Sequence, residues 1–422
     1  MVYEGFDVPM PTSRDVSVFD ATVRGRMFIK TSRKTGGRVI SDSKTLADEF
    51  VAKELSRRQM VQAVMLGTVG ALAGSSLLGC TTTVTEQAPA PGPSANPDGT
   101  PVVPGPAPTG KHLVGLGYDA TDRNAALTAA LAETIGLGMI KPGQSVYLRI
   151  NSNSGDLYPY STSAATLLAI GGMLKDLGVT DLRIGDRSFW GDQDTAGNLV
   201  ANGMTAAAKK LGTTAKVYDD SVDWMTLPAS SHPNWNGAVR LPMDVTTADH
   251  QIILSCVKTH FISTVTMSLK ISLGLVHADD RKRPGNLQNH DTKVLYKQIA
   301  QINKALTPSL IIQDGYSAVI SGGPTMNDKP SGAPEGWAGG ITGDPKIFIV
   351  STDRIAADVA GIAILQTLSP AYEAVNKSRP FANPQIQSAI AAGGLGISGA
   401  AEFDVAGPTV PNLDELKAKV TG

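Results

Sequence analysis

Short apolar runs alternate with longer amphipathic stretches from residue 113 to the end of the chain. The apolar runs predict strands at 113–118, 145–150, 181–185, 215–218, 251–257, 309–313 and 346–350. The amphipathic stretches predict helices at 124–136, 163–177, 196–211, 292–306 and 354–365. Strands separated by helices in this way are typical of a mainly parallel sheet covered by helices on both faces. The sequence therefore predicts an α/β fold for residues 111–422, with room for two lobes.

Residues 56–80 have a different pattern, which predicts an export signal. Arg57 and Arg58 precede an uncharged run at 61–79 that is rich in Ala, Gly, Leu and Val. This run is too weakly apolar for a permanent membrane helix but suits a signal peptide. The arginine pair resembles a twin-arginine export signal. Leu77-Leu78-Gly79-Cys80 resembles a lipobox, which implies cleavage before Cys80 and acylation of that residue.

Residues 81–110 predict a linker, because they contain eight prolines and no aromatic residue. Such a segment buries too little surface to offset the entropy lost on ordering it. Residues 1–55 are long for the start of a signal and leave two alternatives, a cytoplasmic extension or a start placed too far upstream. We expect export by the twin-arginine machinery and a lipid anchor in a membrane, on the periplasmic side of the cell envelope.

Composition narrows the classes of function. The net charge is −1 and aromatic residues make up 5% of the chain, which gives no support for a nucleic-acid partner. The cysteines are Cys80 and Cys256. If Cys80 carries lipid, an internal disulfide is excluded, and so is a cysteine-held iron–sulfur cluster, which needs about four cysteines. Cys256 lies in an apolar run and is expected to be buried in a strand rather than to act as a nucleophile.

Polar residues follow five of the predicted strands. Ligands of parallel α/β sheets bind beyond the carboxyl ends of the strands, so we expect these residues to converge on one edge. They are Asn151, Asp186-Arg187-Ser188, Lys258-Thr259-His260, Asp314-Gly315 and Thr352-Asp353. The candidate ligand-binding residues among them are Asp186, Ser188, Asn151 and Asp314. Asp353 also suits the N-cap of the next helix, and Asp314-Gly315 also suits a turn.

One segment concentrates cationic donors. Lys258, His260 and Lys270 lie near one strand end and the turn that follows it, an arrangement that suits a carboxylate or phosphate. We predict these three as catalytic residues that act on a small anionic ligand. Taken singly, each lysine is equally compatible with a solvated side chain and His260 with a satisfied loop histidine. Further along, His277 and the charged run 279–283 predict a solvated loop.

A series of short motifs follows in order along the chain. They are Lys141-Pro142-Gly143, Ile184-Gly185-Asp186, Val257-Lys258-Thr259-His260, Ser268-Leu269-Lys270 with Gly274, His290, Asp314-Gly315, and Thr352-Asp353 with Asp358. Over about 113–399 the sequence resembles the domain of unknown function 362 family. Many members have Lys-Pro-Asn where this chain has Arg149-Ile150-Asn151, and Lys-Asn where it has Lys270-Ile271. The cysteine clusters of some members are absent, so the resemblance implies no electron transfer.

The spacing of His260 and Lys270 is similar to that in nickel-pincer lactate racemases. There, a catalytic histidine lies ten residues before the lysine that holds a nickel-bearing nicotinate derivative. The resemblance implies a transition metal with His290 and His260 as ligands, and no other cofactor is indicated. It implies that His260 shuttles a proton of a 2-hydroxy acid while the metal-bound ring takes up the hydride. The glycine-rich segment of the racemases is replaced here by 261–269.

Two classes of function follow from these residues. The first is a metal-assisted enzyme of the racemase or isomerase type that acts on a small anionic substrate. The alternative is a non-catalytic envelope lipoprotein that binds an anionic ligand or a protein partner. A structural or assembly factor without a ligand is a third reading.

Overall fold

The computed structural model describes residues 112–188, 194–283, 286–288, 291–326, 339–368 and 373–421. A mixed sheet runs through them in the order β12-β1-β11-β9-β7-β2-β3-β4, with β10 paired to β9 and β8 paired to β7. These strands are β1 (His112–Tyr118), β2 (Ser145–Arg149), β3 (Asp181–Asp186), β4 (Ala215–Val217), β7 (His250–His260), β8 (Thr264–Val265), β9 (Pro308–Ser321), β10 (Ile341–Gly343), β11 (Ile347–Ser351) and β12 (Phe403–Ala406). A separate antiparallel pair consists of β5 (Trp224–Thr226) and β6 (Arg240–Pro242).

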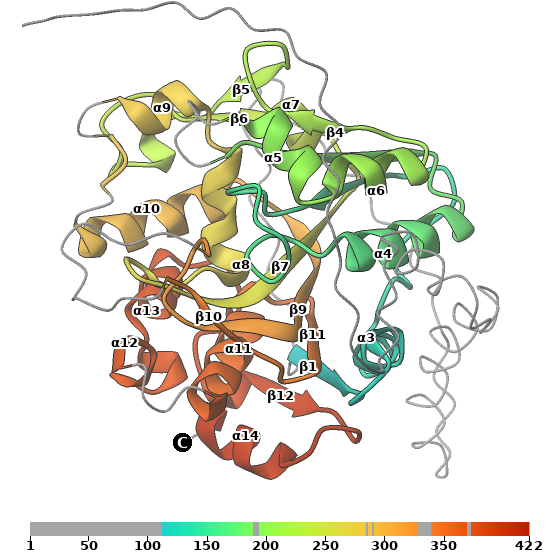
Figure 1. Cartoon of the computed structure of the whole chain (residues 1–422). Coiled ribbons are helices and arrows are strands. Elements are labelled where there is room, and N and C mark those ends of the chain that lie inside the picture. Colours follow the sequence, from blue (N-terminus) through green and yellow to red (C-terminus); the bar gives the residue numbers. More distant parts are fainter. Residues whose placement is uncertain are drawn as a thin grey trace, which may run out of the picture. The chain divides into compact units, whose positions relative to one another are not determined.

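Helices cover both faces of the sheet, as Figure 1 shows. One face carries α3 (Arg123–Ala132), α4 (Ala164–Asp176), α5 (Thr195–Ala201) and α6 (Met204–Lys210). The other carries α8 (Met267–Lys270), α10 (Thr292–Lys304), α11 (Arg354–Leu368), α13 (Pro384–Ala392) and α14 (Leu413–Thr421). The remaining short helices are α7 (Met243–Thr246), α9 (Ala278–Lys282) and α12 (Glu373–Asn376). Alternate strand residues feed the two cores, since Leu148 packs in the first and Tyr147 in the second. The predicted α/β class is confirmed.

One predicted helix is divided in two. Residues 196–211 form α5 and α6, and Gly203 lies between them with a φ of 84°. Glycine adopts this left-handed conformation without a steric penalty, so the chain turns there instead of continuing the helix.

Strand direction corrects one expectation about the candidate site. β4, β3, β2, β7 and β9 run parallel, but β11 is antiparallel to both of its neighbours. Asp353 follows β11 and therefore lies at the opposite edge of the sheet, near His112 at the start of β1. Its Oδ1 accepts hydrogen bonds from the N–H groups of Ile355 and Ala356, so it caps α11. The ends of β2, β3 and β7 converge on the carboxyl edge, whereas Asp314 lies inside β9, which continues to Ser321 instead of ending in the turn predicted at Asp314-Gly315.

The order of the strands reverses between β2 and β7. From β2 the chain crosses through α4 to β3, on one side of the sheet. From β7 it crosses through α8, α9 and α10 to β9, on the other side. The two connections leave the sheet in opposite directions, and ligands of open α/β sheets bind at such a reversal of strand order, beyond the carboxyl ends of the strands. Arg149, Lys258 and His260 lie at these two ends.

No helix among the described residues has the length and apolar character needed to cross a bilayer. The predicted export and lipidation residues Arg57, Arg58 and Cys80, the linker at 81–110 and the candidate metal ligand His290 lie outside the described residues.

Candidate functional site

The end of β7 places two of the predicted catalytic residues in the interior. Lys258 is 0% exposed and His260 is 6% exposed. After His260 the chain turns back through β8 and enters α8, which carries Lys270. Thr264 and Met267 in this connection have φ values of 68° and 38°. Such values are uncommon for residues other than glycine and cluster at ligand-binding sites, because tertiary contacts must hold them.

The three side chains influence one another electrostatically. Burial lowers the pKa of His260 well below its ordinary value, and the charges of Lys270 and Lys258 lower it further. Burial lowers the pKa of Lys258 to about 8. Burial and the charge of Lys258 lower the pKa of Lys270 to about 7. Within the described part of the chain, neither lysine forms an ion pair with a carboxylate. The three residues that the sequence singled out therefore influence one another in the structure, and the two lysines have no carboxylate counter-charge among the described residues.

The hydrogen bonds of His260 define its tautomer. Its Nδ1 accepts a hydrogen bond from the backbone N–H of Ile262 at 3.0 Å. Because the ring is neutral at ordinary pH, its proton resides on Nε2. No hydrogen-bond acceptor for Nε2 occurs among the described residues. His260 therefore presents an N–H donor at the carboxyl edge, and it is a poor proton acceptor.

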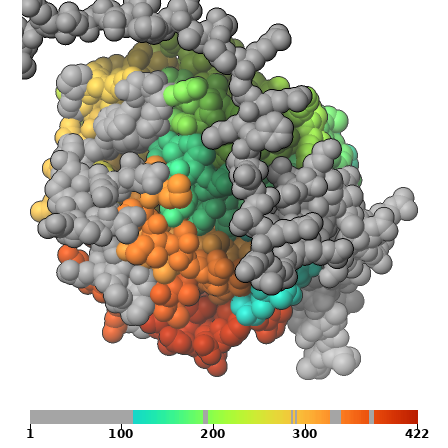
Figure 2. All heavy atoms as spheres, in the orientation of Figure 1, coloured from blue at the N-terminus to red at the C-terminus, as the bar shows by residue number. Residues whose placement is uncertain are grey.

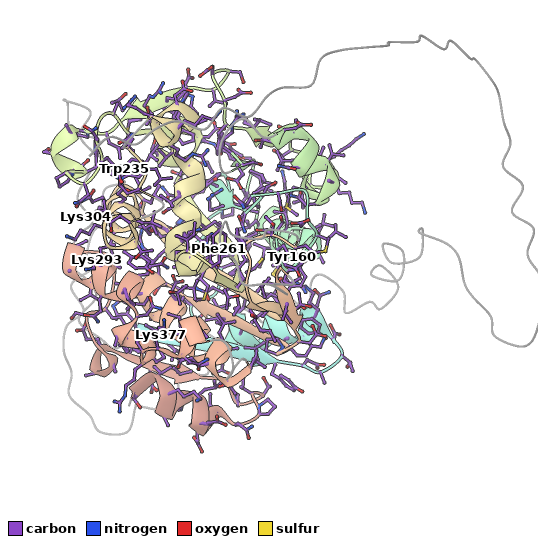
Figure 3. All side chains as sticks on the ribbon, turned by 60° about the vertical axis from the view of Figure 1, so that its left-hand side comes forward. Tyr160, Trp235, Phe261, Lys293, Lys304 and Lys377 are labelled. Carbon is purple, nitrogen blue, oxygen red and sulfur yellow. The ribbon has the colours of Figure 1, made fainter. Side chains whose placement is uncertain are left out.

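Lys258 is held by the segment that follows β2. Its Nζ donates to the carbonyl oxygen of Tyr160 at 2.5 Å, which uses one of its three donor positions. The hydroxyl of Tyr160 donates to Gly340 O at 2.8 Å, just before β10. Tyr160 and Phe261 are labelled in Figure 3. Figure 2 shows the surface of the segment after β2, in blue-green, next to the orange surface of the β9 and β10 region.

Two buried residues fix the turn that carries Lys270. Asp358 of α11 accepts hydrogen bonds from Ser268 N at 2.8 Å, Ser268 Oγ at 2.5 Å and Leu269 N at 3.1 Å. Burial raises the pKa of Asp358 to about 6 in spite of these donors. From α10, the side-chain amide of Asn303 donates to Leu269 O at 2.8 Å. α8 is therefore anchored at both ends, which fixes the position of Lys270.

An arginine–aspartate pair adjoins this group. Arg149 Nη1 donates to Asp186 Oδ1 at 2.7 Å, and both side chains are buried. Arg149 Nη2 donates to the carbonyl oxygen of Ile271, the residue after Lys270. A Cβ atom at Gly274 would lie 2.4 Å from Arg149 Nη2 and 2.6 Å from Asp186 Oδ1. Only glycine lets this turn pack against the pair.

The four candidate ligand-binding residues are engaged within the protein. Asp186 accepts from Arg149, and the Ser188 hydroxyl donates to Ser152 O at 2.8 Å and accepts from Asn198 Nδ2 at 2.9 Å. Asn151 donates from its side chain to Tyr160 O and from its backbone to Thr162 Oγ1.

Asp314 is equally engaged. It is paired with Arg123, and it accepts hydrogen bonds from the hydroxyls of Tyr158 and Thr166, each at 2.6 Å. These contacts favour a structural role for Asp186, Ser188, Asn151 and Asp314, and their predicted ligand binding stays a prediction.

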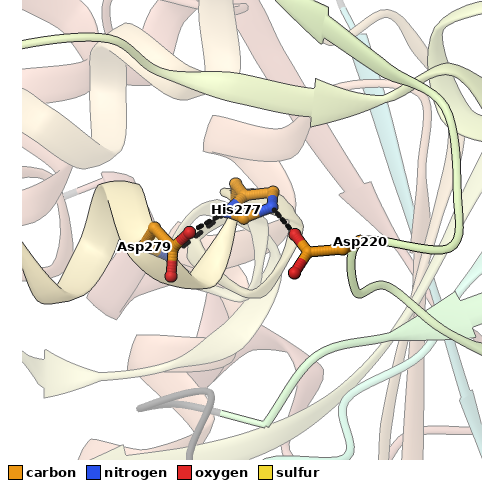
Figure 4. A group of neighbouring side chains, drawn as sticks. All are labelled: Asp220, His277 and Asp279. Carbon is orange, nitrogen blue, oxygen red and sulfur yellow. Dashed lines mark hydrogen bonds and ion pairs between the residues drawn. The ribbon is translucent and has the colours of Figure 1, made fainter.

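The segment of His277 is not the solvated loop that the sequence predicts. His277 is 3% exposed and lies between Asp220 and Asp279, as Figure 4 shows. Its Nδ1 accepts from Asp279 N and from Arg240 Nη2, and its Nε2 lies 3.0 Å from Asp220 Oδ1. With both ring nitrogens engaged, the histidine caps α9 and fits a structural role better than a metal site.

A further polar groove lies away from this edge. Its volume is about 780 Å³, and its lining includes the first residues of β3 together with parts of β4 and α7. Its cations are paired, since Lys216 Nζ lies 2.7 Å from Asp244 Oδ2 and Arg183 bonds to Asp181. The groove therefore lacks the unpaired cations that distinguish the carboxyl edge.

Sequence reasoning missed three features of the edge. Arg149 is noted only as a departure from the family pattern, although it is buried in an ion pair beside Lys270. Tyr160 gives no signal in the sequence, because it acts through its backbone carbonyl. Arg281 is predicted to be solvated but is 1% exposed.

The comparisons with known proteins agree with the motif pattern. Residues 146–363 match the family described as Domain of unknown function (DUF362), and the matched span contains Arg149, Asp186, Lys258, His260 and Lys270. Neither the curated proteins nor the solved structures contain a match. Because the match covers more than half of the chain, the protein belongs to the DUF362 family.

Proposed function

We propose that this protein is an enzyme that binds a small anionic carbonyl compound at the carboxyl edge and moves a proton on it. The observation that carries this proposal is the group Lys258, His260 and Lys270. Lys258 is a buried ammonium, His260 has an N–H donor without a partner among the described residues, and Lys270 has a pKa of about 7. Strongly shifted pKa values without a structural partner are typical of catalytic groups.

Each residue has a distinct role in the proposal. Lys258, fixed by Tyr160, anchors the negative charge of the substrate. The neutral amine of Lys270 accepts a proton from the carbon next to the carbonyl group, and the C–H electron pair moves to the carbonyl oxygen. His260 donates its Nε2–H to that oxyanion. Return of the proton to the same face regenerates the substrate, and delivery to the opposite face of that carbon or to the neighbouring carbon gives a racemase or isomerase reaction.

A metal at His260 is less compatible with the observed contacts. Metal-binding histidines usually donate from the ring nitrogen that faces away from the metal. Here Nδ1 accepts a hydrogen bond from Ile262 N, which leaves the proton on Nε2. The nickel-dependent reaction expected from the racemase resemblance therefore lacks support at His260.

Proton exchange in D₂O tests the proposal without knowledge of the final product. The full chain is incubated with pyruvate, 2-oxobutyrate or a triose phosphate, and loss of the exchangeable C–H signal is followed by proton NMR. We expect exchange by the wild-type protein. The Lys270→Met variant should lose about 10²- to 10⁴-fold of the rate, because it lacks the base.

An exposed lysine supplies the matched control. Lys293 on α10, labelled in Figure 3, is exposed, and Lys293→Met should exchange at the wild-type rate. Equal rates in Lys270→Met and wild type would refute the assigned base. If the anions bind at this edge and none of them exchanges, the non-catalytic binding protein is the better description.

We further propose that the domain is exported and lipid-anchored at Cys80, with Arg57 and Arg58 as the export signal. The order of arginine pair, uncharged run and lipobox supports this. The double variant Arg57→Lys/Arg58→Lys should leave an unprocessed precursor in the cytoplasm, and a Cys80→Ala variant should incorporate no labelled fatty acid. Normal processing of the arginine variant would refute the twin-arginine route.

A further inference from the structure

Arg281 is a buried cation without a partner among the residues that the structure describes. It lies on α9, and its side chain is 1% exposed. None of its three guanidinium nitrogens makes a hydrogen bond. Burying a charge without a partner is costly, and such groups are rare in folded proteins. The side chain therefore has hydrogen-bonding capacity that the chain itself does not satisfy.

Asp186 is the carboxylate whose charge acts on Arg281, but its oxygens already accept hydrogen bonds from other donors. Asp186 Oδ1 accepts from Arg149 Nη1 and from Arg187 N, each at 2.7 Å. Asp186 Oδ2 accepts from Ser152 N at 2.5 Å. Both carboxylate oxygens of Asp186 therefore have donors, and neither accepts a hydrogen bond from Arg281.

The acidic neighbour of Arg281 on α9 is also occupied. Asp280 is fully buried and accepts from Arg240 through Nε at 2.9 Å and Nη2 at 2.9 Å. It accepts a further bond from Arg283 Nη2 at 3.1 Å. Arg149, Arg240 and Arg283 therefore have carboxylate partners, and Arg281 does not.

The local balance of charge favours an anion. Asp186 is already paired with Arg149, and burial together with the charges of Arg149 and Arg187 lowers the pKa of Arg281. A guanidinium remains charged under these conditions, so the region carries excess positive charge. The planar N–H donors of the Arg281 guanidinium match two oxygens of a carboxylate or phosphoryl group.

We propose that Arg281, beside the Arg149–Asp186 pair, binds a second oxyanion group, either phosphoryl or carboxylate, at the far end of the ligand. The proposal rests on the proposed function, because Arg149 also bonds to Ile271 next to Lys270 and so joins the two groups. The substrate would thus be a small compound with an anionic group at each end.

The direction in which substitution of Arg281 shifts the melting temperature tests the proposal. In phosphate-free buffer, Arg281→Met should melt at the wild-type temperature or up to about 2 °C above it, because an unpaired buried charge is removed. Arg354→Met is the matched control, since Arg354 is also buried but donates to Asn303 O, Asn303 Oδ1 and Leu306 O. It should melt roughly 5 °C or more below wild type, because these acceptors lose their donors.

Inorganic phosphate and acetate are the binding probes, used with the full chain. Saturating phosphate should raise the melting temperature of wild type and of Lys270→Met by roughly 5 °C, and the rise should be clearly smaller in Arg281→Met, where only the lysines of the carboxyl edge remain to bind the anion. An equal rise with acetate assigns the subsite to carboxylates, and a rise with phosphate alone assigns it to phosphoryl groups.

Three results would overturn the inference. One is a melting temperature of Arg281→Met as low as that of Arg354→Met, which would make Arg281 structural. Another is a response to the anions that is equally large in wild type and Arg281→Met, or absent from both. If the response is instead lost only in Lys270→Met, the anion binds at the lysines. That result refutes the second subsite and leaves the proposed function standing.

Discussion

Two groups of buried charges lie at the carboxyl edge of the sheet, and they are organised in opposite ways. Around Asp314 every charge has a partner. Arg123 forms its ion pair, and the guanidinium also stacks on the ring of Tyr158, 4.5 Å from its centroid. Around Lys258 and Lys270, by contrast, no described carboxylate reaches the ammonium groups, and burial lowers the pKa of both.

This difference separates structural charges from candidate ligand-binding charges. A buried ion pair whose two charges neutralise each other has little net charge left to attract an ionic ligand. A buried cation without a carboxylate costs stability, and proteins retain such groups mainly where function requires them. Position after a predicted strand does not distinguish the two cases, because both Asp314 and Lys258 follow an apolar run in the sequence and both lie inside longer strands in the structure.

The largest expected effect concerns the paired group. Asp314→Ala leaves Arg123 buried without its carboxylate, so the free energy of unfolding should fall by about 3–5 kcal/mol. Urea denaturation measures this loss. The exchange rate per folded molecule should stay within about twofold of wild type. A stable variant with a lost exchange activity would reverse the roles that we assign to the two groups.

The unpaired group should respond in the opposite way. His260→Gln removes a donor to the oxyanion, and the exchange rate should fall by about 10²- to 10³-fold. His250 begins the same strand and bonds to Ser309 and Gln144, so His250→Gln is the matched control at the other end of β7. Exchange by NMR should be unchanged in the control, and an equal loss in both variants would argue for a general effect on β7.

The pH dependence should follow the two lysines. Below a pH of about 7, Lys270 is protonated and cannot accept a proton, so the rate should fall about tenfold per pH unit. Above a pH of about 8, Lys258 loses the charge that anchors the substrate, and kcat/KM should fall again. A profile that is flat from pH 6 to 9 would exclude lysines with these pKa values from the reaction.

The smallest effect is expected at the thiol between the two groups. Burial raises the pKa of Cys256 to about 11, and the charges of Lys258 and Arg123 both act on it. Its Sγ donates to Ser161 O at 3.1 Å. Cys256→Ala should cost about 1 kcal/mol of stability and leave the exchange rate unchanged. A large loss of rate would give the thiol a chemical role that its burial opposes.

The sequence predicted much of the fold, because apolar periodicity reports burial directly. It identified the strands that build the carboxyl edge and the group Lys258, His260 and Lys270. It did not predict the direction of β11, since an apolar run of five residues reads the same in either direction. That direction moved Asp353 to the opposite edge.

The ion-pair partners of the charged residues also could not be predicted from the sequence. Asp314 and Asp186 look like ligand-binding carboxylates until Arg123 and Arg149 are found beside them, 191 and 37 residues away along the chain. Arg281 lies in a run of charges that is typical of a solvated loop, and only its packing on the end of β3 reveals a buried cation.

The most direct test of the central claim is the affinity of the full chain for a small dianion as a function of pH. Titration calorimetry with malonate at pH 6.5 and pH 9 compares wild type with Lys270→Met. If the lysines bind the anion, wild type should bind malonate at pH 6.5, and its affinity should fall at least about tenfold by pH 9, where the lysines lose their charge. At pH 6.5 the Lys270→Met variant should bind malonate more weakly than wild type does. No binding at either pH, or an affinity independent of both pH and Lys270, would contradict an anion site at this edge.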